Sequence, residues 1–363
     1  MSNIKIETLT AVHIGTGNIL QKDCDFVYQK VVGKNSIGII DPAKILKLIG
    51  QAKIDAWSVA IDKGRDTVDF VRQYSPKSEI RDYTSRQIVS YLSGAPRQIK
   101  EFIHDGLNRP YIPGSSIKGA IRTAVLSSII KGMKDSDTKI RNNANKVTAK
   151  AMENTLFGHD PQSDVFRCLQ VGDALFDRNS TAAYNMVNIN ERTSQPYWDK
   201  SKQMATEVLP DGDEAMFKMK IVKKEGLPLR PELSSLPNLM STVNEHTIDL
   251  LNSEIKIWQA KDVDSESEAK VEDYVKQLED MREEAEECQG KKTCVLRVGH
   301  GSGWRFITGA WTERLADQEF MDIEEVARPR NYLYHDYMFP KSRRVDETYS
   351  EPLGFVKLTL EDA

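Results

Sequence analysis

The two ends of this chain carry strand-like alternation, and the stretches between them carry helical periodicity. Near the start, Ile4 and Ile6 alternate with charged residues, and residues 354–360 alternate again near the end. In between, residues 116–131 and 143–157 repeat apolar residues at helical spacing. Terminal strands that enclose helices favour one sheet to which both chain ends return. We therefore expect an α+β fold with a ferredoxin-like βαββαβ core and long insertions.

Length and composition indicate a globular protein. The chain has 363 residues, of which 39% are hydrophobic and 29% charged, enough for two domains or for one domain with a large insertion. We favour the insertion. No stretch is apolar enough to cross a bilayer, and the start, MSNIKIETLT, lacks the apolar region of a signal peptide. We expect a cytoplasmic protein with no membrane partner.

The net charge of −4 hides an asymmetry along the chain. Residues 246–287 hold 14 acids against 5 bases, so the rest of the chain carries a net +5. The same segment has helical periodicity, which predicts an acidic helical insertion. A mildly basic body is compatible with a polyanionic partner on one surface.

These shifts in pattern suggest a division of the chain. We expect residues 1–185 to form the first part of the core. Residues 186–291 should form an insertion, first an irregular finger or thumb and then the acidic helices. Residues 292–363 should return to the core with a glycine-rich loop and the last strand.

The segment YIPGSSIKGAIRT, residues 111–123, has the features of a phosphate grip. Pro113 ends the preceding element, and a serine can cap a helix that begins near Ser116. Lys118 and Arg122 lie four residues apart near the helix N-terminus, where free N–H groups favour an anion. The alternative is an ordinary amphipathic helix with solvated cations. The expected grip consists of Gly114, Ser115, Ser116, Lys118 and Arg122.

Two glycine-containing loops are further candidates for an RNA contact. Alternating glycines let a phosphate or ribose approach the backbone, and the residues between and after them supply polarity, stacking and charge. The later loop comprises Gly299, His300, Gly301, Ser302, Gly303, Trp304 and Arg305. The earlier one carries Gly15 and Gly17. The alternative for both is a tight turn at a strand end.

Other residues are weaker candidates. His13 could contact RNA or be a satisfied strand histidine, and the second alternative is favoured. The late cations Lys341, Arg343 and Arg344 could follow an RNA backbone, although charge runs are more often solvated surface.

Metal, cofactor and catalytic sites are not expected. Cys24, Cys168, Cys288 and Cys294 form no CxxC pair and have no histidine at ligand spacing, so reduced thiols are the default. The glycine loop is neither GxGxxG nor a Walker A loop. The histidines that could titrate near neutral pH form no recognisable constellation with Tyr or Lys.

Five segments in order resemble the RAMP superfamily of CRISPR effector subunits. They are IGTG (14–17), YIPGSSIKGAIRT (111–123), LFG followed by LQVGDALF (156–176), RVGHGSG (297–303) and PLGFVKL (352–358). Their order, with the late KSRR before PLGF, looks most like the type III-A subunit that caps the Csm complex at the crRNA 3′ end. The resemblance does not cover residues 186–291.

The resemblance implies an RRM-like core with RNA bound across it. It implies a subunit that holds the 3′ part of the crRNA, caps the backbone filament and supports crRNA maturation. Its partners would be crRNA, the backbone and small Csm subunits and possible trimming nucleases, with no direct DNA contact.

We therefore expect a non-catalytic crRNA-binding subunit, with two alternatives. One is a RAMP endoribonuclease that processes precursor crRNA with His300 or His13 as general base. The other is a backbone subunit that slices target RNA, which would require Asp25, although its IGTGNILQKDCDF context departs from that pattern.

Overall fold

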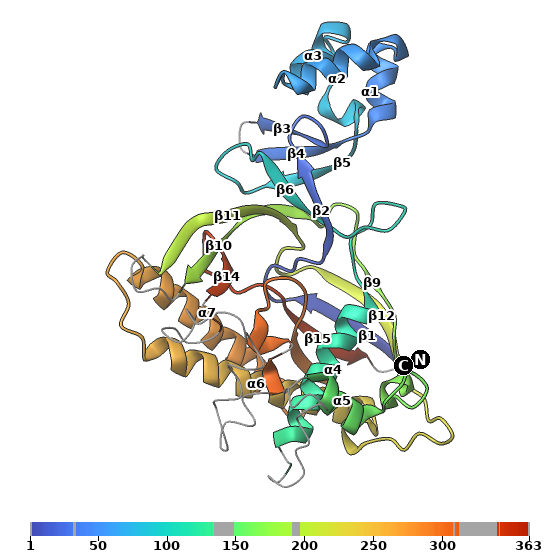
Figure 1. Cartoon of the computed structure of the whole chain (residues 1–363), viewed down its shortest axis with the longest axis vertical. Helices are drawn as coiled ribbons and strands as arrows, with labels where there is room; N and C mark the ends of the chain where they lie inside the picture. The colour runs from blue at the N-terminus through green and yellow to red at the C-terminus, as the bar shows by residue number, and fades with distance from the viewer. Residues whose placement is uncertain are drawn as a thin grey trace.

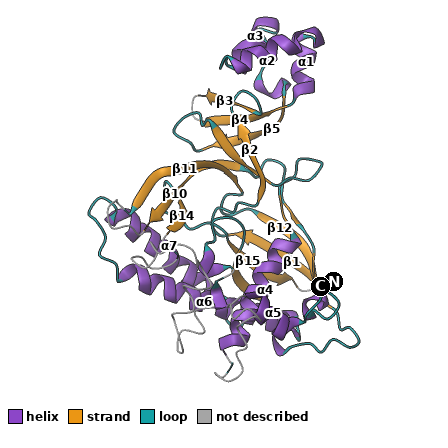
Figure 2. Cartoon of the chain, in the orientation of Figure 1, coloured by secondary structure: helices purple, strands orange, loops and turns teal. Residues whose placement is uncertain are grey.

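The computed structural model describes residues 2–31, 34–131, 133, 149–190, 197–307, 309–311, 340 and 342–361 (Figures 1 and 2). The strands are β1 (Ser2–Thr8), β2 (Gly15–Gln21), β3 (Phe26–Val31), β4 (Lys34–Ile40), β5 (Thr84–Ser90), β6 (Gln98–Phe102), β7 (Tyr111–Ile112), β8 (Leu169–Val171), β9 (Ala174–Leu175), β10 (Ala182–Asn190), β11 (Trp198–Val208), β12 (Glu214–Ile221), β13 (Thr293–Arg297), β14 (Ser342–Asp346) and β15 (Phe355–Glu361). The α-helices are α1 (Pro42–Ile49), α2 (Ile54–Asp62), α3 (Thr67–Tyr74), α4 (Gly114–Lys131), α5 (Ala149–Phe157), α6 (Leu236–Gln259) and α7 (Glu268–Glu287), with 3₁₀ turns η1 (Gln51–Lys53), η2 (Ile80–Asp82), η4 (Val165–Cys168), η5 (Pro231–Leu233) and η6 (Trp304–Phe306).

The first sheet is antiparallel and has the strand order β13-β15-β1-β12-β8. Its terminal strands pair directly, with Ile4 opposite Leu360 and Ile6 opposite Leu358. The two ends of the chain therefore lie side by side (Figure 1). This pairing confirms that both ends of the chain return to one sheet.

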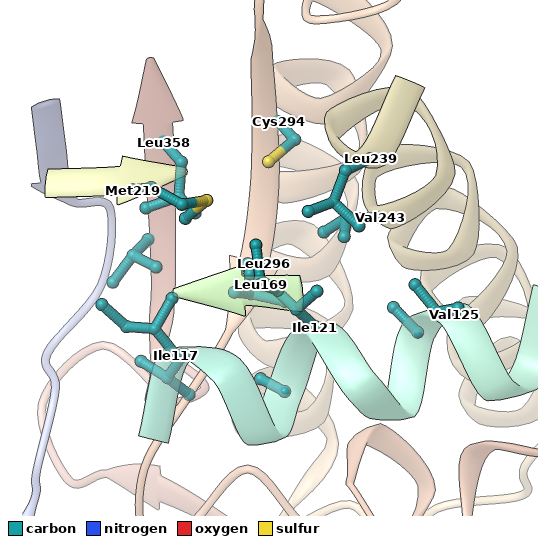
Figure 3. Packing of buried hydrophobic residues seen from close by; sticks show 14 of the residues in the cluster. Ile117, Ile121, Val125, Leu169, Met219, Leu239, Val243, Cys294, Leu296 and Leu358 are labelled. Atoms are coloured by element: carbon teal, nitrogen blue, oxygen red, sulfur yellow. The ribbon is translucent and has the colours of Figure 1, made fainter. Parts of the chain in front are cut away.

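Helices α4 and α6 pack on this sheet and form the largest hydrophobic core (Figure 3). From α4, Ile117, Ile121 and Val125 point into it at helical spacing, and from α6 so do Leu239 and Val243. The expected amphipathic helix is thus confirmed, but it begins at Gly114 and not at a serine cap near residue 116.

The second sheet is larger and mixed, with the order β2-β6-β11-β10-β5-β4-β3 and with β14 paired to β10. It curls, and helices α1 to α3 lie beyond its β3–β4–β5 end, far from the chain ends (Figure 1). The first of these helices has the Asp41 cap, whose carboxylate accepts the Ala43 and Lys44 N–H groups, and has Pro42 at its first position. The described residues therefore form a mixed α/β fold with two large curled sheets, and β7 and β9 pair in a small two-stranded one.

The range 186–291 does not lie outside the sheets. Strand β12 occupies the first sheet between β1 and β8, because Ala215, Phe217 and Met219 alternate and bury one face in the core. The acidic segment is a helical pair, as expected, but its first helix belongs partly to the main core. Farther along, Leu251 and Trp258 of α6 pack with Tyr274 of α7 in a second core.

Two further details refine the expectations. The segment LQVGDALF, residues 169–176, does not form one continuous strand but the two short strands β8 and β9. The helix expected over 143–157 is present as α5 from residue 149, and Gly158 follows it with φ +125°, while residues 143–148 lie outside the described part. Within the described residues, no helix has the length and apolarity needed to span a membrane.

Candidate nucleic-acid interface

The glycine loop after β13 has a backbone that only glycine adopts readily. Gly299, Gly301 and Gly303 have φ values of +82°, +88° and +79°. Between them, the buried Ser302 hydroxyl lies 3.0 Å from the Val298 carbonyl oxygen and 2.9 Å from that of Gly299, which closes the loop on itself. The alternation seen in the sequence therefore corresponds to a rigid turn.

This loop packs tightly against the segment that links β1 and β2. The His300 N–H donates to the carbonyl oxygen of His13 over 2.8 Å. A Cβ at Gly299 would lie 2.6 Å from that same oxygen, which leaves no room for a side chain. The glycine at 299 is thus required by a close backbone approach, and that approach fixes where the loop presents His300.

A group of basic side chains meets at the loop. Lys100, from β6, donates through Nζ to Nε2 of His300 over 3.1 Å, because an ammonium group has no acceptor. Arg344, from β14, lies against the loop, since a Cβ at Gly301 would be 3.4 Å from Arg344 Cγ. Its guanidinium donates to the Lys202 carbonyl oxygen over 3.2 Å. We call Lys100, His300 and Arg344 the basic cluster.

The electrostatics of the basic cluster favour an anion. Burial, followed by the charge of Arg344, lowers the pKa of Lys100. Burial, followed by the charges of Lys100 and Arg344, lowers the pKa of His300, and burial lowers that of Arg344. In the described part of the chain, no carboxylate forms an ion pair with these three side chains. A phosphate placed here would supply the missing negative charge and would reverse these shifts.

His13 lies beneath the cluster and not on its surface. Its side chain is 2% exposed, its Nδ1–H donates to the Glu207 carbonyl oxygen over 2.6 Å, and its ring meets that of His300 edge-on at 5.7 Å. Burial lowers the pKa of His13 to about 4. The structure thus places His13 as a hydrogen-bonded support, and an RNA contact by it stays a prediction.

The early glycines belong to the same region. Gly15 opens β2, and a Cβ there would lie 2.9 Å from His13 Nε2. Gly17 has φ +92° and open space around its Cα. Gly15 therefore leaves room for the His13 ring, Gly17 adopts a positive φ within β2, and the expected RNA contact of both stays a prediction.

At the start of α4, two donors of the predicted phosphate grip already bind acceptors of the chain itself. The Gly114 N–H donates to the Asp173 carboxylate over 2.7 Å, and Lys118 Nζ donates to the Leu169 carbonyl oxygen over 2.9 Å. Ser115 and Ser116 lie in the first turn of the helix. The free N–H groups that would attract a phosphate are thus partly satisfied by a carboxylate.

Arg122 has a structural environment. It donates to Glu153 over 3.0 Å and to Asp164 over 2.8 Å. Its guanidinium also lies over the rings of Phe157 and Phe166, at 4.6 and 5.0 Å from the ring centroids. These partners belong to α5 and to the segment before β8, and none belongs to the glycine loop. The solvated face considered as the alternative for this helix is not observed at Arg122.

Two of the late arginines are buried in an ion-pair network. Arg343 forms two hydrogen bonds with the Glu254 carboxylate, and Arg305 Nε lies 3.6 Å from it. Arg305 and Arg343 are 7% and 9% exposed. They fix η6 and β14 to α6, whereas Arg344, the next residue, reaches the glycine loop. Trp304 is half-buried beside Gly309, and Lys341 lies outside the described residues.

Sequence reasoning missed Lys100. It lies in a short strand with no motif around it, and only the alternation of QIKEF could have indicated that it faces away from Ile99. The carboxylates near β2 have structural partners. Asp25 accepts the Gln21 N–H over 2.8 Å, and Asp23 accepts the Thr67 N–H over 3.2 Å. Among the described residues, no three His, Cys, Asp or Glu side chains gather as metal ligands.

The sequence of the chain matches a known protein family. A family model described as the RAMP superfamily matches residues 5–306. The chain is 35% identical over 103 residues to the "CRISPR system Cms protein Csm5" of Methanocaldococcus jannaschii, covering 26% of this chain and 23% of that one. It is 23% identical over 248 residues to the Csm5 of Enterococcus italicus, covering 60% of this chain and 59% of that one. The alignments thus span less than two thirds of these curated relatives.

Solved structures resemble the chain over nearly its whole length. A chain in a cryo-EM structure of a Csm-crRNA-target RNA ternary complex of a type III-A CRISPR-Cas system aligns with a TM-score of 0.71 and 20% identity, covering 99% of this chain and all of that one. The crystal structure of T. onnurineus Csm5 aligns with a TM-score of 0.64 and 21% identity, covering 97% and 99%. At these identities the likeness concerns the fold.

Proposed function

The chain belongs to the RAMP superfamily, and we propose that it is a non-catalytic crRNA-binding subunit of a type III-A Csm effector complex. In this role it holds the 3′ part of the crRNA, caps the filament of backbone subunits and supports crRNA maturation. Its partners are the crRNA, the backbone and small subunits and trimming nucleases, in the cytoplasm of a prokaryote. The observation that carries the proposal is the basic cluster of Lys100, His300 and Arg344.

The chemistry of the basic cluster suits a guide RNA. Its donors are cations and it contains no group arranged to read a base edge, so it would bind the backbone irrespective of sequence. A guide RNA varies in sequence from one complex to the next, and a subunit that holds it needs this kind of contact. The names of the Csm5 relatives and the ternary complex with a similar chain support the assignment to this assembly.

The test is binding of labelled crRNA to the purified chain as a function of salt concentration. We expect Lys100→Ala/Arg344→Ala to weaken binding and to reduce the slope of log K against log salt by about 1.4, since each phosphate contact to a single strand contributes about 0.7. Lys47→Ala/Arg81→Ala, which removes two exposed cations that belong to α1 and η2 and not to the cluster, should leave the slope nearly unchanged.

A further variant separates the basic cluster from the grip predicted at α4. Lys118→Ala should bind RNA as the wild type does, because the Lys118 ammonium already donates to the Leu169 carbonyl oxygen. A larger loss for Lys118→Ala than for Lys100→Ala/Arg344→Ala would move the phosphate contact to α4. Failure of the wild-type chain to bind RNA at any salt concentration would reject the proposed function.

We also assign the first sheet to the ferredoxin-like, RRM-like topology expected from the sequence. Strands β15-β1-β12-β8 are adjacent in that order, with α4 between β1 and β8 in the chain and α6 between β12 and β15. This arrangement supports a βαββαβ core in which both helices cover one face. In the domain division 1–185, 186–291 and 292–363, the middle part would then supply one core strand and one core helix.

One observation favours a second function, cleavage of precursor crRNA without metal. His300 has a lowered pKa and contacts Lys100, so a neutral imidazole able to accept a proton lies beside a cation able to stabilise a phosphorane. The test is incubation of repeat-containing precursor RNA with the chain in the presence of a chelator. Specific cleavage that disappears in His300→Ala would establish this activity, and intact RNA would leave the non-catalytic function.

A further inference from the structure

An open hollow lies where the β10–β11 hairpin separates from the neighbouring strands. Strand β10 pairs with β5 only at Ala182 and Ala183, and β11 pairs with β6 only at Thr206. The other described residues of the hairpin pair with neither β5 nor β6, and the loop of residues 92–97 lines one side of the gap. The result is an open cavity of about 700 Å³, within the about 300–1,000 Å³ range of ligand pockets.

Side-chain amides dominate the polar lining of this cavity. On the hairpin, Asn185 Nδ2 donates to Gln203 Oε1 over 3.2 Å and to Glu347 Oε2 over 2.6 Å. On the opposite side, Gln98 Nε2 donates to Gln21 Oε1 over 3.1 Å. Among the described contacts, the Asn185 Oδ1 acceptor and the Gln203 Nε2 donor have no partner, and they belong to two amides that are hydrogen-bonded to each other. A neighbouring donor and acceptor complement the hydrogen-bonding edge of a nucleobase.

The rest of the lining also suits a nucleotide. Arg97 is exposed, and no hydrogen bond or ion pair of its guanidinium is found within the described part of the chain. Leu92 and Met204 supply apolar surface against which a planar ring can pack. None of the described residues that line the cavity is acidic, and Glu347 contacts it only through Asn185. The site therefore offers a donor and an acceptor for the edge of a base, an apolar surface for its ring and one cation for a phosphate.

We propose that this cavity binds one unpaired nucleotide of a single-stranded RNA. The base edge meets Asn185 and Gln203, and the phosphate meets Arg97. The proposal rests on the RNA-binding function proposed above but concerns a different site, because none of the basic cluster lines this cavity. It also predicts a property that the basic cluster lacks, namely a preference for the base at one position of the RNA.

Photocrosslinking locates the nucleotide. The probe is labelled single-stranded crRNA with one thiouridine placed at successive positions, bound to the full chain, irradiated, digested and analysed by mass spectrometry. We expect one position to crosslink to peptides from residues 92–98 or 203–205. Bound RNA without a crosslink in these segments would overturn the proposal and leave the proposed function intact. If the wild-type chain binds no RNA, both fail.

Substitution tests the base contact. Asn185→Ala/Gln203→Ala should weaken binding about tenfold, as expected for the loss of one bidentate base contact. Changing the base at the crosslinked position should alter the affinity of the wild type but not that of the double variant. The matched control is Gln259→Ala, which removes an exposed amide at the end of α6.

The same variants identify a competing occupant. The hairpin edge next to the cavity could instead accept a strand of another protein. In that case the double variant would bind RNA with wild-type affinity and unchanged base dependence, and no crosslink would reach the cavity. That result would overturn the proposal. Arg97→Ala should weaken binding without changing the base dependence, and Arg81→Ala is its control.

Discussion

Lys100 Nζ and His300 Nε2 lie 3.1 Å apart, although 200 residues separate them in the chain. The contact joins a strand of the second sheet to the loop that leaves the first sheet. Two basic groups in contact, with Arg344 beside them, repel one another when protonated. The cluster is therefore a place where binding of an anion relieves an existing electrostatic cost.

The first prediction concerns the pH dependence of RNA binding. The pKa of His300 lies below its ordinary 6.5, because of burial and of its neighbours Lys100 and Arg344. A bound phosphate favours the protonated imidazole, so affinity should rise several-fold as the pH falls from about 7.5 to about 5.5. His300→Gln should lose this rise. Equal pH profiles for the two proteins, measured by filter binding, would remove His300 from the interface.

The second prediction concerns His13 and acid stability. The folded pKa of His13 is about 4, whereas the ordinary value is 6.5, so the unfolded chain takes up this proton first as the pH falls. Its contribution is complete above pH 6.5 and is lost toward pH 4, about 2 kcal/mol by pH 5. His13→Asn, which can still donate to the Glu207 carbonyl, should lack this part of the acid destabilisation. Urea unfolding of both proteins at pH 7 and pH 5 measures the difference.

The third prediction concerns Glu351, whose ionisation should destabilise the protein as the pH rises and not as it falls. Burial raises the pKa of Glu351 to about 7, and its carboxylate accepts the Ala11 N–H over 3.1 Å. The ordinary value is 4.5, so stability is present below that pH and is lost as the pH rises through 7. Glu351→Gln keeps an acceptor for Ala11 and should gain about 3 kcal/mol at pH 8. The gain should vanish at pH 4, and a gain independent of pH would refute this explanation.

The fourth prediction concerns the buried carboxylate of Glu254. It is fully buried, and interactions with Arg343 and Arg305 hold its pKa at about 2 against the opposing effect of burial. Glu254→Gln leaves buried arginine charge uncompensated and should cost about 3–5 kcal/mol in the free energy of unfolding. Glu284→Gln breaks the more exposed pair with Lys357 and should cost less than about 1 kcal/mol. Similar losses in the two variants would contradict the role of burial.

The fifth prediction separates structure from RNA binding at α4. Arg122 joins α4 to α5 through Glu153 and lies over the Phe157 ring. Arg122→Ala should therefore lower the free energy of unfolding by about 2 kcal/mol while leaving the RNA affinity of the folded protein unchanged. Arg122→Lys should restore little of the lost free energy of unfolding, because an ammonium group lacks the planar, multiple-donor geometry of the guanidinium. A large loss of affinity without destabilisation would instead restore the phosphate grip at Arg122.

Features of the fold that depend on neighbouring residues were predictable. The alternation at Ile4 and Ile6 predicted β1, because side-chain periodicity is local, and the Asp41 cap and Pro42 at the start of α1 are signals of the same local kind. The glycine loop was also recognised, since positive φ values favour glycine in any context. The sequence did not indicate that β12, within the expected insertion of residues 186–291, is a strand of the core, because its pairing with β1 is non-local.

The candidate site depends on contacts across the chain. The sequence by itself determined that cations occur at residues 118, 122, 343 and 344 and that a glycine loop lies near residue 300. The tertiary structure alone decided that Arg122 and Arg343 are paired with buried or half-buried carboxylates, while Arg344 is left for the loop. It alone brought in Lys100. The physical reason is that strand order and register, which non-local pairing sets, determine which distant side chains meet and which charges stay unpaired.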